Sequence, residues 1–289
     1  MRFVAAENGR TLTVNEGGDP GGVPVLVHAG TPGSSVLYEP TVRDAAERGI
    51  RLFTYDRPGY GGSTRDEGRD VAACAADVEA VCDALGIGRF CVWGVSGGGA
   101  HALATAALLP DRVAAAAALA PVAPYGAEGL DFLEGMGEQN IEELRIVFEG
   151  EDAHRAALDR DRRQTLAMSP EQLVEAWTTL LGPADRETLT GSFAEHLLES
   201  IRAGITRTLD GWLDDDIALT RPWGFELDSI RVPVLHLQGE QDRFVPLGHG
   251  LWFAEHIPGV ESQITPDDGH LTLVTRRLPE VHAWLVERY

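Results

Sequence analysis

The sequence predicts an α/β fold, in which a mostly parallel central β-sheet is flanked by helices and a helical segment is inserted between two strands. Short apolar runs bounded by Gly and Pro alternate with longer segments of helical spacing. The runs are continuously apolar, as expected for strands buried on both faces of a parallel sheet. Between residues 125 and 224 the strand pattern stops and only helical spacing remains.

Each element follows from a local pattern. The first 17 residues hold two short apolar segments around Asn8-Gly9, which predicts an antiparallel hairpin at the sheet edge. Buried strands are expected at 23–30, 50–59, 90–96, 113–121 and 232–242, with a short last strand at 261–265. Helices are expected at about 38–48, 71–85 and 98–109, with another closing the chain at 278–289. Such alternation implies right-handed crossovers and helices on both faces of the sheet.

The inserted segment predicts a helical cap on the core. The stretches IEELRIVF, PEQLVEAWTTLL and FAEHLLESIRAGI repeat apolar residues at helical spacing, with charges between them. We therefore expect an α/β core made of residues 1–124 and 225–289, and a cap made of residues 125–224.

The charge of the chain excludes several classes of partner. Its 289 residues include 45 acidic and 24 basic ones, and the net charge of −21 repels nucleic acid and anionic membranes. All basic residues are arginines, so a lysine Schiff base or a P-loop lysine is excluded. We expect a small-molecule substrate, no nucleic-acid or membrane partner, and a monomer or homodimer.

The cysteines and the N-terminus suggest a cytoplasmic protein. Cys74, Cys82 and Cys91 are odd in number and lack C-x-x-C spacing, which indicates buried thiols rather than disulfides or a zinc site. No apolar run is long enough for a transmembrane helix, and no continuous apolar stretch near the N-terminus suggests a signal peptide. We expect no metal and no cofactor.

Ser96 is the candidate nucleophile. It lies in Gly94-x-Ser96-x-Gly98, a pattern that is weak evidence alone because the chain holds 33 glycines. Here the pattern directly follows the predicted strand RFCVW and precedes the helix AHALATAALL, which is the strand-turn-helix setting of a nucleophile elbow. The alternative is a glycine-rich connection with an incidental serine.

A serine hydroxyl needs a base within hydrogen-bond reach, and His270 is the preferred candidate. It follows the last predicted strand on a Gly-preceded loop, in TPDDGHLTL. His101 is close to Ser96 in sequence, but it lies more than one helical turn beyond the serine. We therefore expect a packing role for His101.

The carboxylate that orients the base should follow a strand between these two residues. Asp242, just past the buried strand VPVLHLQG, is preferred, because sites on parallel sheets gather at the carboxyl ends of strands. Glu240 is an alternative candidate for this carboxylate. Asp267 and Asp268 are weaker candidates because they are so close to His270 in sequence.

Two backbone N–H groups are candidates for an oxyanion hole. Attack on a carbonyl creates negative charge, which such donors stabilise. The N–H of Gly97 directly follows the nucleophile, and the N–H of Thr31 lies in HAGTPGSS after the predicted strand 23–30. The alternative for the Gly30–Gly33 stretch is an ordinary tight turn.

These motifs together resemble the α/β-hydrolase family: GVSGGG, GTPGS, YDRPGYGGS, GEQDRFVP and DDGH. The resemblance implies that Ser96, Asp242 and His270 form a catalytic triad. Relatives that attack with an aspartate are set aside, because position 96 is serine. The chain departs from the usual H-G-x-P of the oxyanion turn: Ala29 stands where relatives have histidine, and His28 is one residue earlier. We expect the backbone N–H of Thr31 to remain available for an oxyanion, and the hydrogen bonds of the usual histidine side chain to be absent.

The predicted function is a serine hydrolase acting on a small ester-like carbonyl substrate through an acyl-enzyme. Gly30, Trp177 and Trp212 are candidate substrate contacts, with Phe132 and Phe148 as further apolar candidates in the cap. An alternative is that the same catalytic residues cleave another kind of bond, in an aminopeptidase of the proline iminopeptidase type or in a carbon–carbon bond hydrolase. A third possibility is a non-catalytic ligand-binding receptor.

The acidic residues of the cap bear on the aminopeptidase alternative. A peptidase that binds a free amine would need carboxylates in its pocket. The candidates are Glu134, Glu138, Glu142, Glu143 and Asp214 to Asp216. We expect instead that these residues form a solvated helical face.

Overall fold

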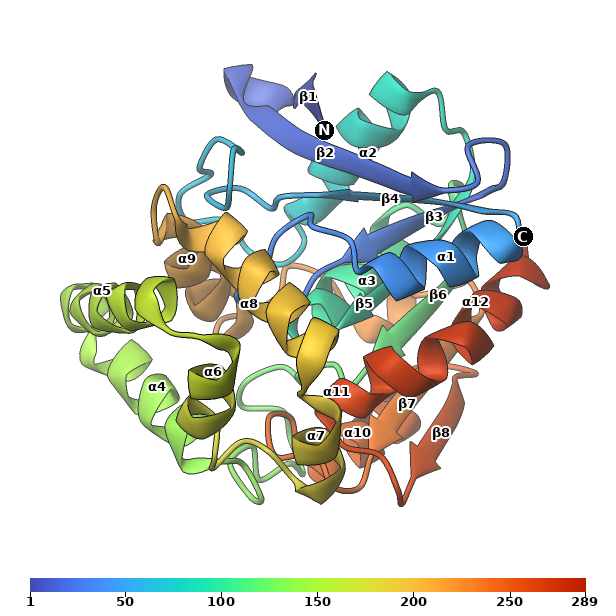
Figure 1. The fold of residues 1–289 in the computed structure, drawn as a ribbon. Helices are drawn as coiled ribbons and strands as arrows, with labels where there is room; N and C mark the ends of the chain where they lie inside the picture. Colours follow the sequence, from blue (N-terminus) through green and yellow to red (C-terminus); the bar gives the residue numbers. More distant parts are fainter.

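The computed structural model describes all residues, 1–289, and is built around one eight-stranded sheet (Figure 1). The strand order is β1-β2-β4-β3-β5-β6-β7-β8. The strands are β1 (Arg2–Ala5), β2 (Thr11–Gly18), β3 (Val23–His28), β4 (Ile50–Tyr55), β5 (Phe90–Val95), β6 (Val113–Leu119), β7 (Val234–Gly239) and β8 (Glu261–Thr265). β2 pairs antiparallel with both β1 and β4, and every other pairing is parallel, so the predicted mostly parallel sheet with an edge hairpin is confirmed.

Helices cover both faces of the sheet (Figure 1). They are α1 (Glu39–Glu47), α2 (Cys74–Leu85), α3 (Gly97–Leu108), α10 (Leu247–His256), α11 (His270–Thr272) and α12 (Leu278–Val286). Neighbouring strand residues point to opposite faces. Leu26 therefore packs with α2, α3 and α10, whereas Val25 and Val27 pack with α1 and α12. The two apolar layers fix the orientation of the strands that carry the candidate site.

Six helices lie between β6 and β7, and they are called the inserted helices below. They are α4 (Glu138–Glu149), α5 (Glu151–Ala167), α6 (Pro170–Ala176), α7 (Pro183–Thr188), α8 (Gly191–Ile205) and α9 (Asp210–Leu219). α9 contacts α3 directly, and the chain then returns to the core at Trp223, which is buried among side chains of one sheet face. In Figure 1 these helices gather at one side of the sheet, where α3 and α11 begin.

Short 3₁₀ turns at Glu7–Gly9 and Leu227–Ser229 and a π turn at Leu273–Arg277 complete the elements. The expected helix at 71–85 begins later, at Cys74, because residues 71–73 form a turn in which Asp70 accepts the N–H of Ala73. All three cysteines are free and buried, as expected. None of the helices combines the length and apolarity that crossing a membrane requires.

Candidate active site

Ser96 occupies the sharp turn between β5 and α3. Its φ of 58° and ψ of −129° are unusual for a residue with a side chain. The turn is held by backbone hydrogen bonds on both sides, from Ser96 N–H to Leu119 O at 2.9 Å and from Gly99 N–H to Ser96 O at 2.8 Å. Backbone strain of this kind persists only where the surroundings enforce it, and it clusters at functional sites.

The glycines of the elbow allow β5 and α3 to approach closely. A Cβ atom at Gly94 would lie 2.1 Å from the carbonyl oxygen of Gly98, and one at Gly98 would lie 2.3 Å from that of His28. Both distances are far inside van der Waals contact. Only glycine therefore fits at either position without moving the backbone that presents Ser96.

His270 and Asp242 come from two different connections and meet in the fold. His270 is the first residue of α11, after β8, and Asp242 follows β7. The Nδ1 atom of His270 lies 2.7 Å from Oδ2 of Asp242, and both side chains are buried. Oδ1 of Asp242 accepts the N–H groups of Phe244 and Val245 at 2.8 and 2.9 Å, which fixes the carboxylate.

The surroundings of His270 favour its charged form. Burial alone would lower the pKa of the imidazole, but the charge and hydrogen bond of Asp242, with a smaller effect of Asp185, outweigh burial and raise it. The ring also stacks on Phe244, with centroids 4.8 Å apart. An imidazolium formed at this position would be stabilised by a fixed carboxylate.

Asp185, on the inserted helix α7, holds the segment that carries His270. Its two carboxylate oxygens accept three consecutive backbone N–H groups, from His270 at 2.8 Å, Leu271 at 2.7 Å and Thr272 at 3.2 Å. The side chain is fully buried, and this burial raises the pKa of Asp185. These N–H groups have no intrahelical partner at the start of a helix, so Asp185 satisfies donors that would otherwise be buried unpaired.

Thr31 and Gly97 lie side by side next to the serine. A Cβ atom at Gly97 would be 2.5 Å from Oγ1 of Thr31. The N–H of Thr31 donates to no protein acceptor, and the N–H of Gly97 is the first of α3, which has no intrahelical partner. Two free backbone donors therefore adjoin Ser96.

Arg57, in the connection after β4, supports the turn that carries Thr31. Its guanidinium donates to the carbonyl oxygens of Ala29 at 2.6 Å and Gly30 at 3.2 Å, and to Oγ1 of Thr31 at 3.1 Å. Hydrogen bonding that we expected to be lost with the usual histidine at position 29 is thus supplied from another element. His28 instead lies buried, with Nε2 3.1 Å from Oγ1 of Thr105.

Asp215 of α9 neutralises this buried arginine. It forms ion pairs with Arg57 and Arg69, each at 2.5 Å, and accepts hydrogen bonds from Tyr60 at 3.0 Å and Thr31 at 2.8 Å. Burial opposes the charge of Asp215, but the two arginines hold the pKa of this carboxyl well below its usual range. The inserted helices therefore supply a counter-charge to the loop beside Ser96.

Ser96 and His270 face one cavity of about 600 Å³ between the core and the inserted helices. The other candidate contacts Gly30, Thr31, Gly97, Trp177 and Trp212 also line it, as does Phe132. Phe148 does not line it, because its side chain is 53% exposed and packs on Tyr125. There is no hydrogen bond between Ser96 and His270; such contacts are often long in unliganded enzymes and tighten with substrate.

The alternative candidates lie elsewhere. His101 is buried, its Nδ1 bonds to the carbonyl oxygen of Gly97 at 2.7 Å, and burial lowers its pKa to about 3. Glu240 is exposed, and so is Asp267. Asp268 pairs with Arg277 at 2.7 Å. None of these side chains bonds to His270.

The acidic residues of α9 do not form the solvated face that we expected. Successive helix positions differ by about 100°, so three consecutive aspartates must point in three directions. Asp214 binds Arg65 at 2.8 Å, Asp215 binds Arg57, and Asp216 points toward the cavity. The expectation of one solvated face was wrong for the three aspartates, because the helix turns them in different directions. It was also wrong for Glu143 of α4, whose side chain lines the cavity.

Known proteins were compared with this chain. The family model for the alpha/beta hydrolase fold matches residues 23–276. The chain belongs to the α/β-hydrolase fold family. The match covers the sheet from β3 to β8 together with the inserted helices.

Relatives of this α/β hydrolase carry several activities in their names. An AB hydrolase superfamily protein, YisY, of Bacillus subtilis is 28% identical, over 90% of this chain and 91% of the relative. A 2-hydroxy-6-oxononadienedioate/2-hydroxy-6-oxononatrienedioate hydrolase of Burkholderia vietnamiensis is 25% identical, over 91% and 86%. An esterase structure from Thermogutta terrifontis has a TM-score of 0.72 at 22% identity and covers 99% of this chain and 98% of that one, which shows the common fold. The protein is accordingly a hydrolase by family.

The sequence interpretation missed Asp185 and a cluster of cavity residues on three inserted helices. The run of three aspartates was the one pattern that could have indicated buried carboxylates. Asp185 gave no such indication, because its partners are backbone groups 85 to 87 residues away.

Proposed function

We propose that this α/β hydrolase is a serine hydrolase that cleaves a small ester-like substrate through an acyl-enzyme. The observation that carries the proposal is the strained Ser96, which faces the same cavity as the His270–Asp242 pair and adjoins two free backbone N–H groups. Nucleophile, base, orienting carboxylate and oxyanion donors are the four parts that acyl transfer by a serine requires.

In the proposed mechanism, Nε2 of His270 takes the proton of Ser96 Oγ as that oxygen attacks the substrate carbonyl carbon. Asp242 stabilises the resulting imidazolium, and the N–H groups of Thr31 and Gly97 stabilise the oxyanion. The tetrahedral intermediate collapses, and His270 returns the proton to the leaving alcohol. Water then attacks the acyl-enzyme with the same proton transfers, which releases the acid and restores Ser96.

We further propose that the inserted helices act as a cap, with residues 125–224 forming the cap and residues 1–124 and 225–289 the core. Trp177 and Trp212 of the inserted segment and Gly30 of the core would contact the substrate. Glu143 and Asp216 place two carboxyl groups in the cavity wall, with no arginine paired to either. Burial raises the pKa of both carboxyl groups, and neither offers the positive charge that would bind a dicarboxylate such as the substrate class in the name of the Burkholderia vietnamiensis relative.

Ser96→Ala tests the proposal. We expect the variant to lose p-nitrophenyl ester hydrolysis and fluorophosphonate labelling while it remains folded by circular dichroism. A series of ester chain lengths, run beside prolyl arylamides, distinguishes ester from amide specificity. Unchanged turnover in Ser96→Ala would refute the serine mechanism, and tight ligand binding without labelling of the wild type would favour a receptor.

A further inference from the structure

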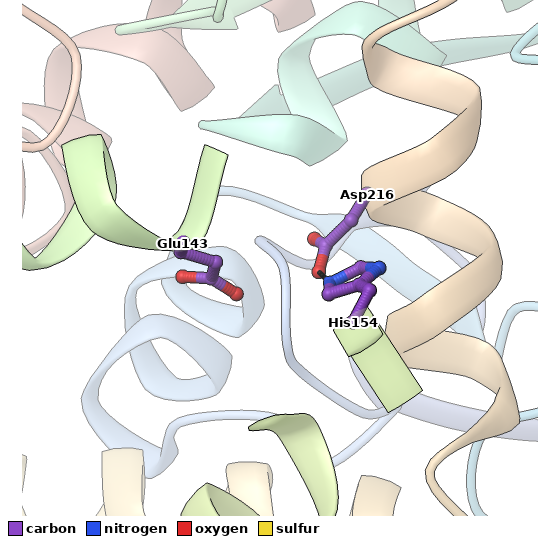
Figure 2. Close-up of side chains that lie close together, drawn as sticks. All are labelled: Glu143, His154 and Asp216. Carbon is purple, nitrogen blue, oxygen red and sulfur yellow. Dashed lines mark hydrogen bonds and ion pairs between the residues drawn. The ribbon is translucent and has the colours of Figure 1, made fainter. Parts of the chain in front are cut away.

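Glu143, His154 and Asp216 come together from three different inserted helices. Glu143 lies on α4, His154 on α5 and Asp216 on α9, and each offers one ligand atom within 4.8 Å of those of the other two. Figure 2 shows the three side chains directed toward one another, and all three line the cavity that Ser96 faces. Neither the serine mechanism nor the packing of the sheet uses this cluster.

His154 is the residue that distinguishes this cluster from a surface acidic patch. Its side chain is 1% exposed, its Nε2 lies 3.0 Å from Oδ2 of Asp216, and its Nδ1 has no hydrogen-bond partner. The only hydrogen bond of the ring therefore lies inside the cluster, through Nε2, and a metal ion at Nε2 requires the tautomer that carries the ring proton on Nδ1. A neutral imidazole of this kind is the commonest metal ligand among side chains.

No arginine of the protein pairs with the two carboxyl groups of the cluster. Asp214 and Asp215, the neighbours of Asp216 in sequence, each bind arginine, but neither Glu143 nor Asp216 forms an ion pair with one. Buried carboxylates are normally paired or coordinate a metal. Trp212, one turn before Asp216 on α9, donates its indole N–H to Oε1 of Glu143 at 3.1 Å. This bond orients the carboxylate and leaves Oε2 available, as outer hydrogen bonds do at metal sites.

We propose that Glu143, His154 and Asp216 bind a divalent transition-metal ion of the zinc type in the wall of the substrate cavity. One imidazole nitrogen and two carboxylate oxygens are a ligand set that such ions accept. Bonds of about 2.0 to 2.2 Å place tetrahedral ligand atoms roughly 3.3 Å apart, so Glu143 needs only a small side-chain adjustment. Three protein ligands leave a fourth position, which here opens toward the cavity and accepts a donor atom of the substrate.

Titration of the metal-free protein with Zn²⁺ and with Co²⁺ tests this site. We expect one equivalent to bind by calorimetry, a rise in melting temperature, and visible ligand-field absorption of the bound Co²⁺. Glu143→Gln and His154→Gln should each weaken binding by more than about 100-fold, since loss of outer hydrogen-bond partners alone costs 10- to 100-fold. Glu149→Gln, which removes an exposed carboxylate from the same helix α4, should leave it unchanged.

The metal site does not depend on the serine chemistry. Ser96→Ala should bind Zn²⁺ like the wild type, so failure of the proposed esterase activity and failure of the metal site are separate results. Weak binding with no defined stoichiometry, or binding that Glu143→Gln and His154→Gln leave intact, would overturn the proposal. Saturable binding of n-butylammonium without any metal binding would also overturn it, and would assign the two carboxylates to a cationic substrate group.

Discussion

Replacing Asp185 with asparagine should show how an inserted helix controls the position of the candidate base. Asparagine keeps the shape of the side chain and can keep one oxygen for the N–H groups of Leu271 and Thr272. Its NH₂ group then faces the N–H of His270, which loses the acceptor that lies 2.8 Å away in the wild type. Because burial already raises the pKa of Asp185, loss of its charge alone should cost little.

The expected cost is therefore that of one buried unsatisfied donor, about 1–3 kcal/mol in the free energy of unfolding. His270 begins α11, so a displaced N–H moves the imidazole with it, and a shift of about 1 Å can reduce catalysis roughly 100-fold. We expect kcat to fall by a factor of roughly 10 to 100 with little change in KM, and Asp185→Glu to restore part of the loss.

The pH profile separates positioning from a purely structural effect. The pKa of His270 is raised above 6.5, and Asp185 contributes to the rise, so ester hydrolysis by the wild type should fall as pH drops through a midpoint above 6.5. Removing the negative charge lowers the pKa of His270, and the acid limb of Asp185→Asn should move to lower pH. The measurements are urea unfolding and p-nitrophenyl ester kinetics from pH 5 to 9, with exposed Glu187→Gln on the same helix as the control. An Asp185→Asn protein with wild-type stability, kcat and midpoint would refute the reasoning.

Two further predictions concern buried groups near Ser96. Asp215→Asn should lower the free energy of unfolding at pH 7 by about 3–5 kcal/mol, because Arg57 and Arg69 lose their buried counter-charge. Because the pKa of Asp215 is lower in the folded state, its charge stabilises the fold at pH values above the unfolded pKa of about 3.9. The difference in free energy of unfolding between wild type and Asp215→Asn should therefore shrink as pH falls below that value. A difference that stays constant in acid would contradict this assignment. His101→Ala should keep ester hydrolysis whereas His270→Ala should lose it, and the reverse pattern in a kinetic assay would exchange their roles.

The sequence was sufficient to predict the sheet and to select the residues that meet around Ser96. Strands buried on both faces have continuous apolar runs, and the elbow needs glycine at fixed spacing from Ser96. Both features can therefore be recognised from neighbouring residues in the sequence. Asp242 and His270 could be placed because each follows a strand, and the carboxyl ends of parallel strands share one edge.

Contacts between the inserted helices and the core could not be predicted in this way. Helical spacing predicts amphipathic helices in the inserted segment, such as α4 and α8, but not where any inserted helix is placed on the sheet. Asp185 binds backbone donors, which any residue offers, and Asp215 binds an arginine 158 positions earlier. Arg57 donates to the carbonyl oxygen of Gly30 and so replaces hydrogen bonding that Ala29 cannot provide. Arg57 is distant in sequence, so no motif around position 29 indicates this contact.

Asp185 and Asp215 also limit how the substrate enters. Lifting α7 and α9 away from the sheet would remove the acceptor of three N–H groups and the carboxylate that neutralises two guanidinium ions, so we expect these two helices to stay in place. The helices α4, α5 and α6 offer neither of these contacts, so we expect the substrate to enter by movement on their side of the cavity. Recombination of segments between relatives should therefore succeed when α4 to α6 are exchanged as a block, and should fail when α7 or α9 is replaced without its partners in the core.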